Sequence, residues 1–143
     1  MHSVLFVGDG GGQLRLDVLG YEREPVGEYF DDNWLSVAVE VKAGGFTGFF
    51  SASVLTGEIE AFHEEAAKLC DSLTGQAKFR TLEEQLSVDL LGDGRGHIRL
   101  TGRAADQPGI GNALAFSFAL DQAQLQSSVQ SLARLLKVFP VRT

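Results

Sequence analysis

Apolar and polar residues alternate along much of the first third of the chain, a period typical of strands with one buried face. Residues 14–18 and 35–41 follow this period, and residues 4–7 can pair with the first of these stretches across a glycine-rich turn. After the second stretch, Gly44-Gly45 supplies the positive φ angles of a tight hairpin. We therefore expect a return strand over residues 46–54.

Two later stretches change to helical spacing. The first starts at Thr56, which we expect to cap the helix, and stops at Gly75. The second opens with Asp121 and Gln124, which can form a capping box, and extends to about Lys137. Apolar residues recur every three or four positions in both, which predicts two amphipathic helices. These residues are Ile59, Phe62, Ala66, Leu69, Cys70 and Leu73 in the first helix, and Leu125, Val129, Leu132 and Leu136 in the second.

Further strand patterns lie between the helices, over residues 77–80, 86–90, 97–103 and 114–120. A glycine-rich turn makes the middle two of these a hairpin. We place Leu91 opposite His97 in that hairpin, which sets Asp89 opposite Arg99. This register pairs opposite charges on one face and aliphatic residues on the other.

Strands outnumber helices, and the short links between them favour antiparallel neighbours. The expected fold class is α+β, with an antiparallel sheet of six to eight strands and two amphipathic helices packed on it. A two-sheet sandwich flanked by helices is the alternative. A chain of 143 residues has the common size of one domain, so we expect a single domain over residues 1–143.

Negative charge is concentrated in the first half of the chain. The net charge is −7, and residues 1–65 carry 12 acidic residues against three basic ones. Five of the acids lie in residues 20–33, which also contain proline and glycine and are expected to form an exposed loop. An acidic surface repels phosphate backbones, so we expect a basic protein partner and no nucleic acid. The alternative is that the charge only keeps the protein in solution.

No apolar run approaches the roughly 20 residues of a membrane span, and no signal-peptide core of about 7–15 apolar residues follows the N-terminus. The single cysteine cannot form an internal disulfide, which fits a reducing compartment. We expect a cytoplasmic protein with no membrane partner.

The familiar catalytic and metal-binding motifs are incomplete in this chain. His63-Glu64-Glu65-Ala66-Ala67 begins like a zinc-protease helix, but alanine stands where the second histidine is required. Asp31-Asp32-Asn33 begins like a calcium loop, but Lys42 occupies the position of the bidentate glutamate. Cys70 lies on the apolar stripe of its helix, where cysteine behaves as a small hydrophobe. We therefore expect no catalytic residue, no metal site and no cofactor.

Several turn and core segments form a recognisable set. They are residues 16–22, residues 31–35, Leu82-Glu83, Gly96-His97-Ile98, Gly111-Asn112 and Asp121-Gln122. Together they resemble the WapI-type family of small bacterial immunity proteins. The resemblance implies a shared fold and a role in neutralising a cognate toxin, often a nuclease, without any catalytic residue.

A basic toxin would meet the acids of the loop and of the first long helix, with nearby aromatic residues as anchors. The expected contact acids are Glu22, Glu24, Glu28, Asp31 and Asp32 in the loop, and Glu58, Glu60, Glu64 and Glu65 on the helix. The expected anchors are Tyr21, Tyr29 and Trp34. In the alternative, Trp34 fills the core and the acids are only solvated.

Two other functions remain open from the sequence. The first is a small-ligand binding module with a pocket under the small-residue face of residues 113–119. The second is a hydrolase that uses scattered acids such as Asp9, Asp31 and Asp93, which would have to converge in a cleft.

Overall fold

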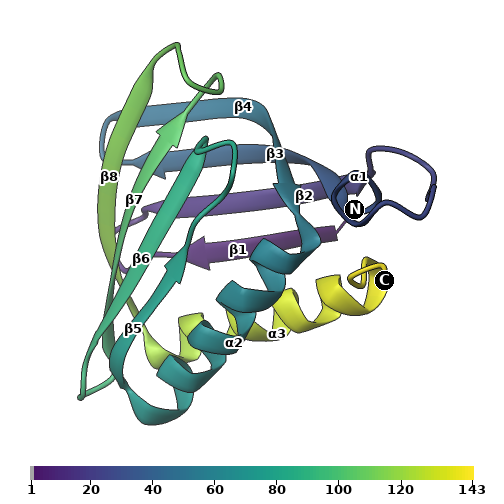
Figure 1. Ribbon diagram of the computed structural model, residues 1–143. Helices are drawn as coiled ribbons and strands as arrows, with labels where there is room; N and C mark the ends of the chain where they lie inside the picture. The colour runs from purple at the N-terminus through teal and green to yellow at the C-terminus, as the bar shows by residue number, and fades with distance from the viewer. Residues whose placement is uncertain (1) are drawn as a thin grey trace.

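The computed structural model describes residues 2–143, which form two four-stranded antiparallel sheets and three helices (Figure 1). The first sheet contains β1 (His2–Val7), β2 (Gln13–Tyr21), β3 (Trp34–Ala43) and β4 (Phe46–Leu55), and the second contains β5 (Thr74–Phe79), β6 (Leu86–Asp93), β7 (His97–Ala105) and β8 (Ala113–Asp121). The helices are α1 (Tyr29–Asp32), α2 (Thr56–Ser72) and α3 (Gln122–Val138). The predicted α+β class is confirmed, with eight strands in two sheets as in the alternative arrangement.

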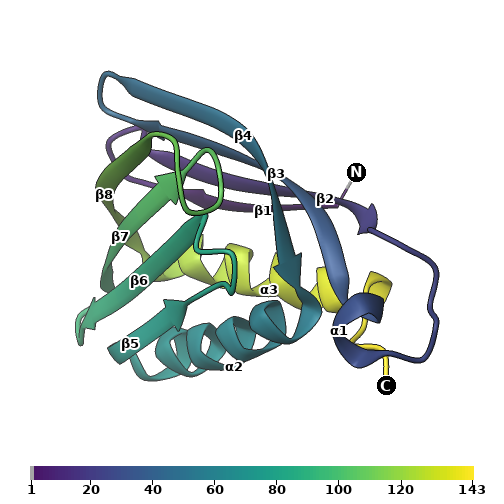
Figure 2. The ribbon, with the colours of Figure 1, turned by 45° about the horizontal axis from the view of Figure 1, so that its top comes forward.

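The same order of elements occurs twice along the chain. Four consecutive strands form a meander and are followed by a helix of 17 residues, first as β1–β4 with α2 and then as β5–β8 with α3. The strands of the two sheets run in different directions, and α2 and α3 lie together beneath both sheets (Figures 1 and 2).

Each long helix covers the first strand of the other half. The Glu65 side chain of α2 accepts the Lys78 backbone N–H of β5 at 2.8 Å. On the other side, the Ser128 hydroxyl of α3 donates to the Leu5 carbonyl of β1 at 2.5 Å. The helices thereby provide partners for backbone groups on strand edges that would otherwise be open.

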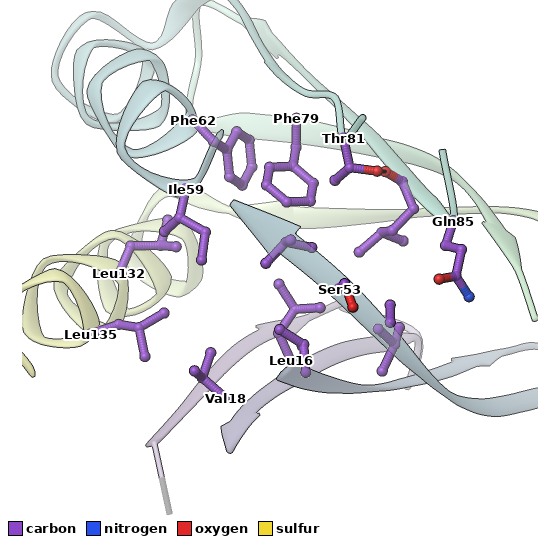
Figure 3. Close-up of a pocket in the computed structure, with 15 residues that line it drawn as sticks. Leu16, Val18, Ser53, Ile59, Phe62, Phe79, Thr81, Gln85, Leu132 and Leu135 are labelled. Atoms are coloured by element: carbon purple, nitrogen blue, oxygen red, sulfur yellow. Dashed lines mark hydrogen bonds between the residues drawn. The ribbon is translucent and has the colours of Figure 1, made fainter. Parts of the chain in front are cut away.

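The core lies between the sheets and the two long helices. Phe62 of α2 is its centre, because its ring lies 6.0 Å from that of Phe6 and 5.3 Å from that of Phe79. Figure 3 shows the apolar side chains that meet here from both sheets and both helices. The remaining space has a volume of about 10 Å³, too little for a water molecule with polar partners, so the interior is filled.

The small-residue face of β8 is the outer one. Phe116 and Phe118 on the opposite face are buried and fill the core, whereas Ala115 and Ser117 are exposed. Over residues 115–118, packed phenylalanine rings occupy the inner side and solvent the outer side of the strand. An open hollow of about 330 Å³ lies at the start of β8, where Ala113 and Leu114 line it together with residues of β4 and of the β7–β8 loop.

The predicted register of the β6–β7 hairpin is wrong by two residues. Asp89 lies opposite Thr101, and Arg99 lies opposite Leu91. The connecting turn is shorter than expected because the Asp93 carboxylate accepts the backbone N–H groups of Arg95 at 2.7 Å and His97 at 3.1 Å. A shift of two residues leaves the side chains on their expected faces.

The ends of α2 also differ from the prediction. Thr56 is buried in the first turn rather than at the cap position, and the Glu58 carboxylate binds the Leu55 N–H there at 2.8 Å. The helix ends at Ser72, and Leu73 takes the left-handed conformation expected of Gly75, with φ of 65°. Among residues 2–143, the helices are too short or too polar to cross a bilayer.

Candidate functional site

An open groove of about 520 Å³ runs between α1, the first half of α2 and strand β5. It brings together part of the acidic loop and part of the acidic helix, which the sequence had placed far apart. Figure 2 shows α1 beside the start of α2. The lining residues are Tyr29, Phe30, Leu55, Gly57, Glu58, Ala61, Glu65, Lys78 and Arg80.

Two aromatic side chains of α1 form one wall of the groove. The ring centroids of Tyr29 and Phe30 are 5.5 Å apart in a T-shaped arrangement. The two side chains are 47% and 54% exposed, so about half of each large apolar surface faces solvent. Aromatic residues in this state are common at the centre of protein interfaces.

The acids of the loop hold α1 in place. Glu28 caps the helix by accepting the Asp31 N–H at 3.1 Å. The Asp32 side chain is buried and accepts the backbone N–H groups of Val26 and Gly27 at 2.7 and 2.9 Å. Asp32, expected at the binding surface, thus faces the inside of its own loop and shapes it.

Asn33 connects α1 to the rest of the molecule. It is fully buried, and its Oδ1 accepts the Thr56 hydroxyl at 2.6 Å and the Arg142 N–H at 2.7 Å. Its Nδ2 donates to the carbonyls of Tyr29 at 2.8 Å and Arg142 at 2.9 Å. The sequence drew attention to Asn33 as part of an incomplete calcium loop, whereas its amide serves as a structural junction.

The four expected contact acids of α2 divide into two pairs. Glu58 and Glu65 face the groove and bind backbone donors of the neighbouring segment, since the second oxygen of Glu58 accepts the Leu82 N–H at 2.6 Å. Burial raises the pKa of Glu58. Glu60 and Glu64 are exposed and have no hydrogen bond or ion pair from another side chain within residues 2–143. This second pair presents free negative charge to solvent.

The remaining expected contact residues lie around α1 but outside the groove. Glu22 accepts the Ser53 hydroxyl, and Glu24 is exposed. Trp34 starts β3 and is partly buried, opposite Leu55 of β4. The groove therefore unites Tyr29, Glu58 and Glu65 of the expected set, and the other expected residues do not line it.

Tyr21 is occupied by the C-terminal segment of the described chain. Its hydroxyl donates to the Pro140 carbonyl at 2.5 Å, and the Arg142 guanidinium lies 3.4 Å from its ring centroid. Burial raises the pKa of Tyr21 despite the nearby positive charge. Tyr21 thus packs within the molecule rather than forming an open anchor.

Within residues 2–143, few acids of the expected contact surface form ion pairs, and the Arg142 guanidinium is directed to the carbonyls of Arg23 and Asp32 in the loop. Of the nine expected contact acids, only Asp31 has an ion pair among residues 2–143, to Arg23 at 3.5 Å. On the β5 side of the groove, Arg80 is engaged by Asp89 at 2.8 Å, and Lys78 is exposed. The groove thus has acidic walls on its helical side and cationic residues on its strand side.

The acids proposed for a hydrolase do not converge. Asp9 lies in the β1–β2 turn, Asp31 in α1 and Asp93 at the β6–β7 turn. Backbone N–H groups at that last turn lower the pKa of Asp93. Among residues 2–143, no three histidine, cysteine, aspartate or glutamate side chains are grouped as metal ligands. The groove residues offer packing and charge, with no nucleophile paired to a base.

Sequence reasoning missed six residues as parts of the groove: Phe30, Leu55, Gly57, Ala61, Lys78 and Arg80. Phe30 gave a usable signal, because a second aromatic residue beside Tyr29 is unusual in an acidic loop. The other five gave none, because a leucine at a strand end, small residues on a helix and basic residues on or next to a strand become a site only through the contact between α2 and β5.

Solved structures show the fold in other proteins. The chain is similar to Trypanosoma bruciei MRP1/MRP2, with 12% identity and a TM-score of 0.50 over 95% of this chain and 83% of that one. It is also similar to the plant transcriptional regulator PBF-2, with 13% identity and a TM-score of 0.53 over 96% of this chain and 82% of that one. At these identities the likeness concerns the fold alone. No curated protein matches the chain in sequence.

The sequence itself matches one family model. The immunity protein WapI-like family covers residues 5–140, which include both sheets except the first residues of β1, all three helices and every residue that lines the groove. The chain belongs to the WapI-like immunity protein family.

Proposed function

We propose that this chain neutralises a basic, nuclease-like toxin by docking its α1–α2 surface onto the cationic surface of the toxin. The α1–α2 surface comprises residues 22–32 and the exposed residues of α2. Membership of an immunity protein family supports a toxin as partner. The observation that carries the proposal is that eight of the nine expected acids have no ion pair within residues 2–143.

The physical argument rests on complementary potential. A nuclease binds phosphates with clustered positive charge, so its substrate path attracts a surface of opposite sign. Exposed carboxylates without an ion pair, such as those of Glu60 and Glu64, accelerate association with a cationic surface. They also disfavour binding of acidic proteins, because like charges repel. An inhibitor seated there blocks the substrate without any chemistry of its own.

A double charge reversal on α2 tests the proposal. Where a toxin domain is encoded beside the gene for this chain, we expect Glu60→Lys/Glu64→Lys to slow association with that domain by about tenfold or more at low salt, because steering by this surface is lost. The dependence of the association rate on salt should weaken as well. Stopped-flow kinetics with a catalytically inactivated toxin measures both quantities.

Asp9→Lys/Glu40→Lys is the matched control, because it makes the same change of charge. Asp9 lies before the start of β2 and Glu40 near the end of β3, whereas α1 joins the opposite ends of these strands. The control should associate within about twofold of the parent. A parent protein that neither binds this toxin nor protects cells from it overturns the proposed function.

A further inference from the structure

We propose that the α1–α2–β5 groove receives an apolar side chain of the toxin that has a lysine or arginine beside it. This inference rests on the proposed function and assigns the contact to one place. Acidic charge alone guides approach, and a specific complex also requires a packed centre from which water is excluded. The groove supplies that centre within the acidic surface.

The groove exists because α2 is narrow at this point. Gly57 and Ala61 are one turn apart on the helix and leave space opposite Tyr29 and Phe30. A Cβ atom at Gly57 would lie 3.3 Å from the Tyr29 hydroxyl, so even a small side chain there would press on the aromatic wall. The volume of about 520 Å³ accepts one large aliphatic or aromatic side chain with part of its backbone.

The aromatic wall is fixed before any partner arrives. The Glu28 cap and the buried Asp32 carboxylate hold α1, and Asn33 ties it to Thr56 at the start of α2. Aromatic side chains on a preorganised segment lose little conformational entropy on binding, which favours their use as anchors.

Charge around the groove decides the chemistry of the occupant. Residues 22–32 hold five acids against Arg23, and α2 holds five acids against Lys68. Of these acids, Glu58 and Glu65 line the helical side of the groove. On the strand side Arg80 is bound to Asp89, and Lys78 is exposed. A cation next to the inserted apolar side chain therefore finds the carboxylates of Glu58 and Glu65 within reach on the helical side, and the excess of acids in the two segments disfavours an anion there.

Filling the groove tests the inference without changing any charge. We expect Ala61→Trp to weaken binding of the inactivated neighbouring toxin at least about 30-fold, mainly through faster dissociation, because the site of insertion is occupied. Tyr29→Ser/Phe30→Ser should weaken binding by a similar factor because it removes the aromatic wall. Surface plasmon resonance at two salt concentrations separates the two rates.

Ala123→Trp is the control for the added indole, because Ala123 is also an exposed alanine, in the first turn of α3 and outside the groove. It should bind like the parent. Parent-like binding by both groove variants, while Glu60→Lys/Glu64→Lys still slows association, overturns the groove and leaves the proposed function standing. Absence of toxin binding by the parent overturns both.

Discussion

Asn33 joins three parts of the chain that are distant in sequence. Its amide contacts α1, the first residue of α2 and the segment around Arg142, and no atom of the residue reaches solvent. Two acceptor and two donor positions are used at once, as only an amide side chain of this length allows. The position of the aromatic wall therefore depends on a residue that lies outside the groove.

We expect Asn33→Ala to destabilise the protein by about 2–4 kcal/mol, because it leaves the buried Thr56 hydroxyl and backbone groups of Tyr29 and Arg142 without partners. Denaturant unfolding followed by far-UV circular dichroism measures the change. Asn112→Ala provides the control at an exposed asparagine and should stay within about 0.5 kcal/mol of the parent. An Asn33→Ala variant as stable as the parent would contradict the role of this junction.

At the scale of elements, alternation and helical spacing predicted the strands and both long helices, because each signal is local. The exceptions arise where a side chain binds the backbone nearby. The Asp93 carboxylate accepts backbone N–H groups in the β6–β7 turn, which shortens the turn and shifts the register of the two strands. The carboxylates of Glu28 and Asp32 accept backbone N–H groups of the expected loop, part of which thereby forms α1. Such bonds depend on three-dimensional placement that hydrophobic periodicity does not report.

The groove could be predicted only in part for the same reason. Acidic composition and the neighbouring aromatics marked its helical side. Its strand side depends on β5 lying along α2, a contact between the two halves of the chain that no local pattern reveals. The use of Glu65 as the acceptor of the Lys78 N–H also follows from that contact.

Glu58 links the start of α2 to the segment before β6, and burial raises its pKa above that of a free glutamate. On acidification the folded state therefore takes up this proton before the unfolded state does. The residue's own contribution to stability is greatest below the pKa of the unfolded chain and declines as the pH rises through the folded pKa.

We expect the stability of Glu58→Gln relative to the parent to increase as the pH rises from about 4 to 7, since glutamine carries no charge to desolvate. The reference pKa of glutamate near 4.3 sets the lower end of this window. Urea unfolding of both proteins across this range gives the difference directly. A constant difference over the range would show that Glu58 titrates alike in the folded and unfolded chains.

At the scale of the whole molecule, the exchange of helices makes the two halves interdependent. Each sheet has its first strand covered by the helix of the other half, and buried residues of both sheets and both helices form one continuous cluster. Two successive units with the same order of elements therefore share one core rather than each having its own.

A single core should unfold as one unit, and Leu125 of α3 offers the test because it is fully buried. We expect Leu125→Ala to cost about 2–5 kcal/mol and to lower the unfolding midpoint equally for two probes. Fluorescence of Trp34, the only tryptophan, reports on the first sheet, and far-UV circular dichroism reports on all elements. Gln126→Ala, an exposed neighbour, controls for the helix position. If the Trp34 fluorescence transition kept the parent midpoint while the midpoint measured by circular dichroism fell, the first sheet would be stable without α3.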